Sequence, residues 1–99
     1  MINLEEITGF DWNAGNSLKN FLKHRVSNTE SEEIFNNKPL IIFEDKFHSE
    51  NEDRYLALGK TNDERKLSVS FTLRLKKIRI ISARDMSKKE RVLYVEKEI

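Results

Sequence analysis

The 99-residue sequence contains no cysteine, one proline and three glycines, and each shortage excludes a class of protein. Without cysteine there are no disulfides, no thiolate chemistry and no cysteine-ligated metals, which fits a reducing cytoplasm. With so little proline and glycine, the chain has no linker or low-complexity segment. We therefore expect residues 1–99 to form a single domain.

Long apolar runs and an excess of one charge are also missing. No apolar run approaches the roughly 20 residues that a transmembrane helix needs. The start, MINLEEITGF, carries acids where a signal peptide carries bases. We therefore expect a cytoplasmic protein with no membrane partner. Because 18 basic residues face 17 acidic ones, net charge does not indicate a nucleic-acid partner, and any functional field depends on where the charges lie.

Two helices are predicted in the first third of the chain. Asn13 can cap a helix over residues 14–24, and Ser27 with Glu30 forms a capping-box pattern that predicts a helix over residues 28–36. The apolar residues of the first helix follow helical spacing and predict a buried stripe of Ala14, Leu18, Phe21 and Leu22. Its opposite face would carry the polar residues Asn16, Asn20, Lys23 and His24.

Four strands are predicted next. Residues 40–45, LIIFED, are apolar on both alternations, which is typical of a strand covered on both faces. Residues 54–60 form a second strand. Residues 66–74, KLSVSFTLR, alternate strictly, so their apolar side chains should pack on the core. The other face, pointing to water or a ligand, would carry Ser68, Ser70, Thr72 and Arg74.

A tight turn near Leu75 and Lys76 should lead into the fourth strand, KIRIISAR. Ser87 and Glu90 form a second capping box, which predicts a last helix ending near Glu98. The predicted fold class is therefore α+β: two N-terminal helices, a four-stranded antiparallel β-meander and a C-terminal helix. The first two helices would cover the apolar face of the sheet and leave the hydroxyl-and-arginine face open or partly covered.

Several separated motifs of the sequence resemble one family in the right order. FDWNAGNSLKNFLKHRVS, RYLALGK, SFTLR and IRIISARDMSKKERVLY are similar to the pattern of the BrnT toxins, from about Phe10 to Tyr94. The resemblance implies a ribonuclease toxin with a RelE-like fold. It also implies a BrnA-like ribbon-helix-helix antitoxin that binds the toxin tightly. The complex would bind operator DNA only through this antitoxin.

Carried over by motif position, the family's functional residues fall on Lys23 and His24, on Arg74, and on Arg79 and Arg84. The chain departs from the family pattern where Asn13 replaces an Asp, Asn16 a common Lys, and Arg25 the Gly of Lys-His-Gly. A residue just past a helix end often adopts the left-handed conformation. An Arg there should cost about 1 kcal/mol relative to Gly.

These residue types suit RNA cleavage without a metal or cofactor, because the 2′-hydroxyl of RNA can attack the neighbouring phosphorus. His24 is the candidate for proton transfer, since its ordinary pKa lies near neutrality, and Lys23 adds positive charge. We expect three guanidinium forks to hold the scissile and adjacent phosphates in one shallow cleft: Arg74, Arg79 and Arg84. Ser70 and Thr72 would contact phosphate or ribose.

Plainer interpretations stand beside this one. His24 can simply end a helix, where the helix dipole favours its cation. Arg84 can pair with Glu90 or Asp85. Arg74 and Arg79 can be charges that discourage aggregation of sheet edges. The chain would then be a non-catalytic module that holds its antitoxin. A general RNA-binding domain is disfavoured, because no strand interleaves aromatic with basic residues.

Overall fold

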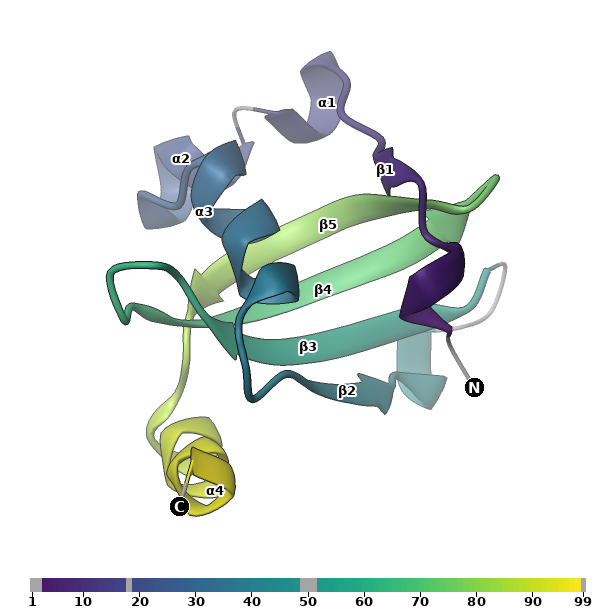
Figure 1. Ribbon diagram of the computed structural model, residues 1–99. Coiled ribbons are helices and arrows are strands. Elements are labelled where there is room, and N and C mark those ends of the chain that lie inside the picture. Colours follow the sequence, from purple (N-terminus) through teal and green to yellow (C-terminus); the bar gives the residue numbers. More distant parts are fainter. Residues whose placement is uncertain (1–2, 18, 49–51, 99) are drawn as a thin grey trace.

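The computed structural model describes residues 3–17, 19–48 and 52–98, and five strands of this part form one mixed sheet (Figure 1). Their order across the sheet is β1-β5-β4-β3-β2. The bounds are Gly9–Phe10 for β1, Ile41–Glu44 for β2, Arg54–Lys60 for β3, Lys66–Arg74 for β4 and Lys77–Asp85 for β5.

The predicted α+β class is confirmed, and so are the antiparallel pairings that join β2 to β3, β3 to β4 and β4 to β5. The prediction of only four strands is wrong, because β1 pairs with β5 in parallel. A two-residue strand is too short to leave a period in the sequence. The turn between β4 and β5 forms as expected, with positive φ at Leu75 and Lys76 (50° and 66°), which matches the twist of the flanking strands.

One face of the sheet carries the main core. The apolar residues of β4 on this face, Leu67, Val69 and Phe71, are fully buried. Helix α3, Asn28–Glu33, crosses this face and continues as a 3-10 helix, Ile34–Asn36 (Figure 1). The predicted capping box is present at its start, since Ser27 Oγ accepts from the Glu30 amide and Glu30 Oε1 accepts from the Ser27 amide.

The first predicted helix is two short ones, α1 (Ala14–Ser17) and α2 (Lys19–His24), so a single helix over residues 14–24 is wrong. The expected cap is present, because Asn13 Oδ1 accepts from the amides of Gly15 and Asn16 at 2.8 and 3.2 Å. Leu22 is 74% exposed, which contradicts its place in a buried stripe. Leu18 and the side chains of Ala14, Asn20 and Phe21 lie outside the described part of the chain.

Asn16, expected on the polar face, is buried instead. Its Nδ2 donates to the carbonyl oxygens of Ile80 (3.0 Å) and Asp11 (3.2 Å), and its Oδ1 accepts from the Asn13 amide at 2.7 Å. The side chain therefore satisfies backbone groups along the edge of β5, where β1 has already ended. A Lys here would bury a cation with three donors and no acceptor.

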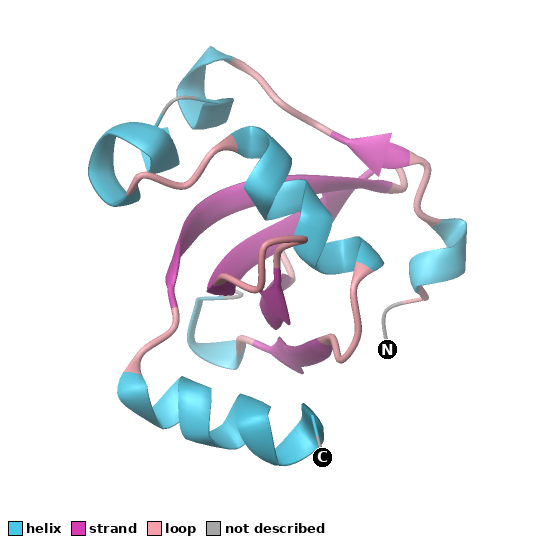
Figure 2. Ribbon diagram, turned by 60° about the vertical axis from the view of Figure 1, so that its left-hand side comes forward, coloured by secondary structure: helices cyan, strands magenta, loops and turns pink. Residues whose placement is uncertain are grey.

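The opposite face of the sheet is partly covered by α4, Lys88–Glu98, so the two faces carry α3 and α4 respectively (Figures 1 and 2). The second capping box is confirmed, with Ser87 and Glu90 bonded reciprocally. Tyr94 is buried with Leu58 in a small second core, and its hydroxyl donates to the Pro39 carbonyl oxygen at 2.5 Å. Burial raises the pKa of Tyr94 to about 12.

Strand β2 was expected to be covered on both faces, and this is wrong. It lies at the edge of the sheet, Phe43 is 41% exposed, and Glu44 is also exposed. The apolar residues of both alternations reflect partial cover: Ile42 packs against the main core, and Ile41 against the small core under α4.

Candidate functional site

The sheet face that α4 partly covers carries hydroxyl and guanidinium groups on its open part. We call this part the arginine face, and its exposed or half-buried members on β4 and β5 include Ser70, Arg74, Arg79 and Arg84. A β-bulge in β5 determines which side chains point to it. Ser70 lies opposite Ser82, but the next residue, Phe71, lies opposite Ile80. Ile81 is therefore an extra residue in β5. Arg79 and Arg84 are an odd number of residues apart and would point to opposite faces of a regular strand. The bulge reverses the alternation between them and places both on the face of Ser70.

The hydroxyls of this face are less open than expected. Ser68 and Thr72 are buried, so their predicted exposure is wrong. The Thr72 hydroxyl donates to the Asp53 carbonyl oxygen at 2.7 Å, and the Ser68 hydroxyl donates to Glu90 at 3.3 Å. Both groups are used inside the protein. Ser70, which lies between them, is half-buried and is the hydroxyl of β4 within reach of a surface ligand.

Each predicted arginine of the face has a carboxylate partner. Arg74 lies 3.7 Å from Glu52, and Arg79 lies 3.7 Å from Asp11. Both distances are beyond hydrogen-bonding range.

Arg84 is held more tightly by Glu90. Its Nη1 and Nη2 donate to the two carboxylate oxygens at 2.7 and 3.1 Å, and Nη1 also donates to the Asp85 carbonyl oxygen. The hydrogen bonds to Glu90 raise the pKa of Arg84. Burial alone would raise the pKa of Glu90, but hydrogen bonds from Arg84 and the Ser87 backbone outweigh it and hold that pKa below its usual value. The pairing of Arg84 with Glu90, expected as the plainer interpretation, is confirmed.

The arginines form a row on the sheet and do not converge. Arg79 lies opposite Thr72 and Arg84 opposite Ser68, four residues apart on β4, which corresponds to roughly 13 Å along a strand. Arg74 lies six residues along β4 from Ser68, the residue opposite Arg84, so it is roughly 20 Å along the strand from Arg84. The expectation that the three arginines meet in one shallow cleft is therefore wrong, and they form a row along the sheet, which we call the arginine track.

Lys23 and His24 end α2, which packs along β5. Arg65 Nη2 donates both to the His24 carbonyl oxygen at 3.2 Å and to Asp85 Oδ2 at 3.2 Å. The end of α2 therefore lies beside Asp85, which follows Arg84 in β5 but points to the opposite face of the sheet. His24 thus lies near the end of β5 that carries Arg84, whereas Arg74 lies at the other end, beside the β4–β5 turn.

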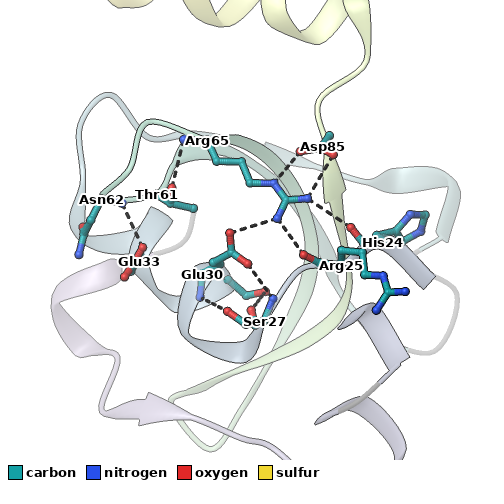
Figure 3. Close-up of polar contacts among 10 residues, drawn as sticks. His24, Arg25, Ser27, Glu30, Glu33, Thr61, Asn62, Arg65 and Asp85 are labelled. Carbon is teal, nitrogen blue, oxygen red and sulfur yellow. Dashed lines mark hydrogen bonds and ion pairs between the residues drawn. The ribbon is translucent and has the colours of Figure 1, made fainter. Parts of the chain in front are cut away.

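Sequence reasoning missed Arg65, which makes the densest polar contacts of the site (Figure 3). Its Nε and Nη2 donate to both carboxylate oxygens of Asp85 at 2.8 and 3.2 Å. Its Nη1 donates to Glu30 at 3.1 Å and to the Arg25 carbonyl oxygen at 2.8 Å, and Nη2 also donates to the His24 carbonyl oxygen at 3.2 Å. The sequence held no signal for these contacts, because the partners are 20 to 41 residues away.

Arg54 was also missed. It lies opposite Thr72 on β3, and Thr72 lies opposite Arg79, so the register places Arg54 on the arginine face. The next residues of β3 on that face are Leu56 and Leu58. Alternation therefore did not mark Arg54 as part of a polar surface.

A family model matches most of the chain. The model for the family described as "Ribonuclease toxin, BrnT, of type II toxin-antitoxin system" matches residues 12–90. The chain belongs to this family. Comparison with curated proteins gives no match. The matched range contains α2, the whole of β2 to β5 and the capping box of α4, and therefore every arginine of the face.

Membership of the BrnT family makes the chain a toxin-type protein with an antitoxin as its partner. Every helix in the described part of the chain is too short or too polar to span a bilayer. The expected left-handed conformation where BrnT toxins usually carry Gly is also confirmed, since Arg25 has a φ of 57°. Arg65 binds the carbonyl oxygen of this strained residue.

Proposed function

We propose that this BrnT chain is a metal-independent endoribonuclease that cuts RNA along the arginine face and so inhibits translation in the cytoplasm. The observation that carries the proposal is the bulge at Ile81, which places Arg79 and Arg84 on one face with Ser70. A regular strand would have separated the two guanidinium groups. Two guanidinium groups on one face suit phosphates of the same RNA strand that lie a few nucleotides apart.

In the proposed reaction, the 2′-oxygen of RNA attacks the adjacent phosphorus and the bond to the 5′-oxygen breaks. The products are a 2′,3′-cyclic phosphate and a 5′-hydroxyl. One proton leaves the 2′-hydroxyl and one is delivered to the 5′-oxygen. His24 takes part in this proton transfer, Lys23 adds positive charge beside it, and Arg84 stabilises charge on the phosphate oxygens.

The remaining groups bind the flanking nucleotides. Arg79 and Arg74 hold phosphates further along the track, where their carboxylate partners lie 3.7 Å away and are easily exchanged. Ser70 contacts phosphate or ribose. Thr72 supports the face indirectly, through its bond to the Asp53 backbone.

We further propose that a BrnA-like ribbon-helix-helix antitoxin neutralises the chain by forming a hetero-oligomer with it. The toxin reaches operator DNA through that partner alone. An interface of this kind should bury at least about 1,000 Å², so cover of the arginine face would exclude RNA.

Cleavage of single-stranded RNA in EDTA tests the enzymatic proposal. Arg84→Ala should lower kcat by roughly 10²–10³-fold, the usual effect of removing one donor to a developing anion. His24→Ala should lower it by roughly 10²–10⁴-fold. Lys60→Met is the control, since Lys60 pairs with Glu64 and with Glu98 of α4. Dependence on added metal would end the metal-free scheme, and full activity of His24→Ala would remove His24 from it.

The second candidate is a non-catalytic module that only holds the antitoxin. It is favoured by the carboxylate partners of all three predicted arginines and by the strained Arg25. Expression of the chain alone separates the two. Growth arrest that disappears in Arg84→Ala supports the enzyme. Harmless expression together with tight binding of the antitoxin supports the module.

A further inference from the structure

Arg65 connects the end of α2, α3 and the end of β5, which are far apart in the sequence. Its backbone is held in place by hydrogen bonds. It lies in the loop between β3 and β4, where the Arg65 amide donates to Thr61 Oγ1 and the Thr61 amide donates back to the Arg65 carbonyl oxygen. Thr61 is buried. The loop thus presents the Arg65 side chain from a fixed backbone.

The guanidinium uses five N–H donors on five acceptors, which is the full capacity of an Arg side chain. Two acceptors are the carbonyl oxygens of His24 and Arg25, at the end of α2, where helix carbonyls have no intrahelical partner. The others belong to Asp85, which ends β5, and to Glu30, which caps α3. Figure 3 shows the guanidinium between these groups, with the His24 ring pointing away from it.

The described side chains at the end of α2 contribute little packing. A six-residue helix is too short to be stable alone. Leu22 and Lys23 are exposed, so their packing does not fix the helix end. Val26 anchors the chain after the turn, but the turn passes through Arg25 at positive φ, a conformation that persists only when its surroundings hold it.

We infer that Arg65 is a positioning residue for the reaction, and this inference rests on the proposed function. It binds the backbone of His24 on one side and the carboxylate of Asp85 on the other. Arg84, the neighbour of Asp85, donates to the Asp85 carbonyl oxygen. Asp85 and Arg84 point to opposite faces of the sheet, so Arg65 ties the backbone of the proton-transfer residue to the end of the strand that carries the Arg84 fork. The electrostatics agree, because Arg65 holds the pKa of Asp85 below its usual value.

Two variants and a control test the inference. Arg65→Met removes the fork, and Arg65→Lys keeps the charge but cannot reproduce five donors in a plane. Both should lower kcat for RNA cleavage by roughly 10- to 100-fold, the effect of a small misplacement of a catalytic group, with KM within about twofold of the parent because the face arginines stay in place. Lys60→Met, which also removes a cation with two carboxylate partners, should leave kcat unchanged.

Hydrogen exchange of the segment 22–27 provides a readout that does not need activity. Exchange should quicken in both Arg65 variants and stay as in the parent in Lys60→Met. A parent-like kcat in Arg65→Lys, a rise in KM alone, or unchanged exchange in Arg65→Met would each overturn the inference. If the parent chain cuts no RNA, the proposed function fails, whereas the exchange result still decides whether Arg65 holds the turn.

Discussion

Replacement of Glu90 measures how strongly the arginine face is tied to α4. Its carboxylate accepts four hydrogen bonds: from the Ser87 amide, from both Nη atoms of Arg84, and from the Ser68 hydroxyl. Glu90→Gln keeps an acceptor for the capping box, in which Gln is tolerated, but removes the charge and one acceptor of the fork. Glu90→Ala removes the cap as well.

The expected magnitudes follow from exposure. The Arg84 side chain is 42% exposed and that of Glu90 is 18% exposed, so the pair is worth less than a buried one, and Glu90→Gln should cost about 1 kcal/mol. Glu90→Ala should cost about 1 kcal/mol more, the usual value of a helix cap. For a domain of this size, each kcal/mol corresponds to about 4–8 °C in Tm.

The stability difference between the parent and Glu90→Gln should depend on pH in a definite direction. The folded pKa of Glu90 lies below its ordinary value of 4.5. The ion pair therefore contributes fully above that ordinary value, and its contribution is lost as pH falls through the lower folded pKa. Below that point the parent carries a neutral Glu90 and should resemble Glu90→Gln in stability.

Urea denaturation at pH 7 and at steps down to about pH 3 measures the difference between parent and variant. The gap should close as the pH falls below 4.5. A gap of the same size at every pH would refute the reasoning, because the variant would then act through packing and not through the charge. Equal stability of Glu90→Gln and parent at pH 7 would show that the fork contributes nothing.

Three further predictions concern stability and use urea denaturation at pH 7. Arg25→Gly should stabilise the fold by about 0.5–1 kcal/mol, since φ is 57° there; a loss of stability would mean that the Arg side chain outweighs the strain. Gly59→Ala should cost about 1–3 kcal/mol, because its Cβ would lie 2.9 Å from Ile34 Cβ, and a neutral result would mean that the 3-10 helix carrying Ile34 shifts freely. Tyr94→Phe should cost about 1 kcal/mol by leaving the Pro39 carbonyl oxygen without its donor, and an unchanged midpoint would show that water replaces the hydroxyl.

The sequence predicted those features that local interactions determine. The strict alternation of residues 66–74 matches the bounds of β4, since period two is the strongest local sign of a strand with one buried face. Both capping boxes were predicted from Ser and Glu three residues apart, because each box closes within one turn. The α+β class and the β4–β5 turn followed from the same local patterns.

The sequence did not predict features that depend on residues far away in the chain. Alternation does not reveal an extra residue such as Ile81, because the bulge exists only relative to β4. Asn16 was expected at the surface, but its side-chain amide donates to a backbone carbonyl oxygen of β5 that is 64 residues away in the chain. Arg65 read as one charge among several in a loop, although its partners come from three other elements. The position of the site was therefore predictable in part, and its internal support was not.

The carboxylates of the arginine face determine how that face would exchange ligands. Glu52 and Asp11 lie 3.7 Å from their arginines, and such loose, partly exposed pairs contribute little. A phosphate can replace them at small cost, so Arg74→Ala should weaken RNA binding without destabilising the fold. Glu90 also caps α4, so release of Arg84 from it would disturb that helix. Arg84 would therefore meet a phosphate while still bonded to Glu90, as a fixed fork at the His24 end of the track.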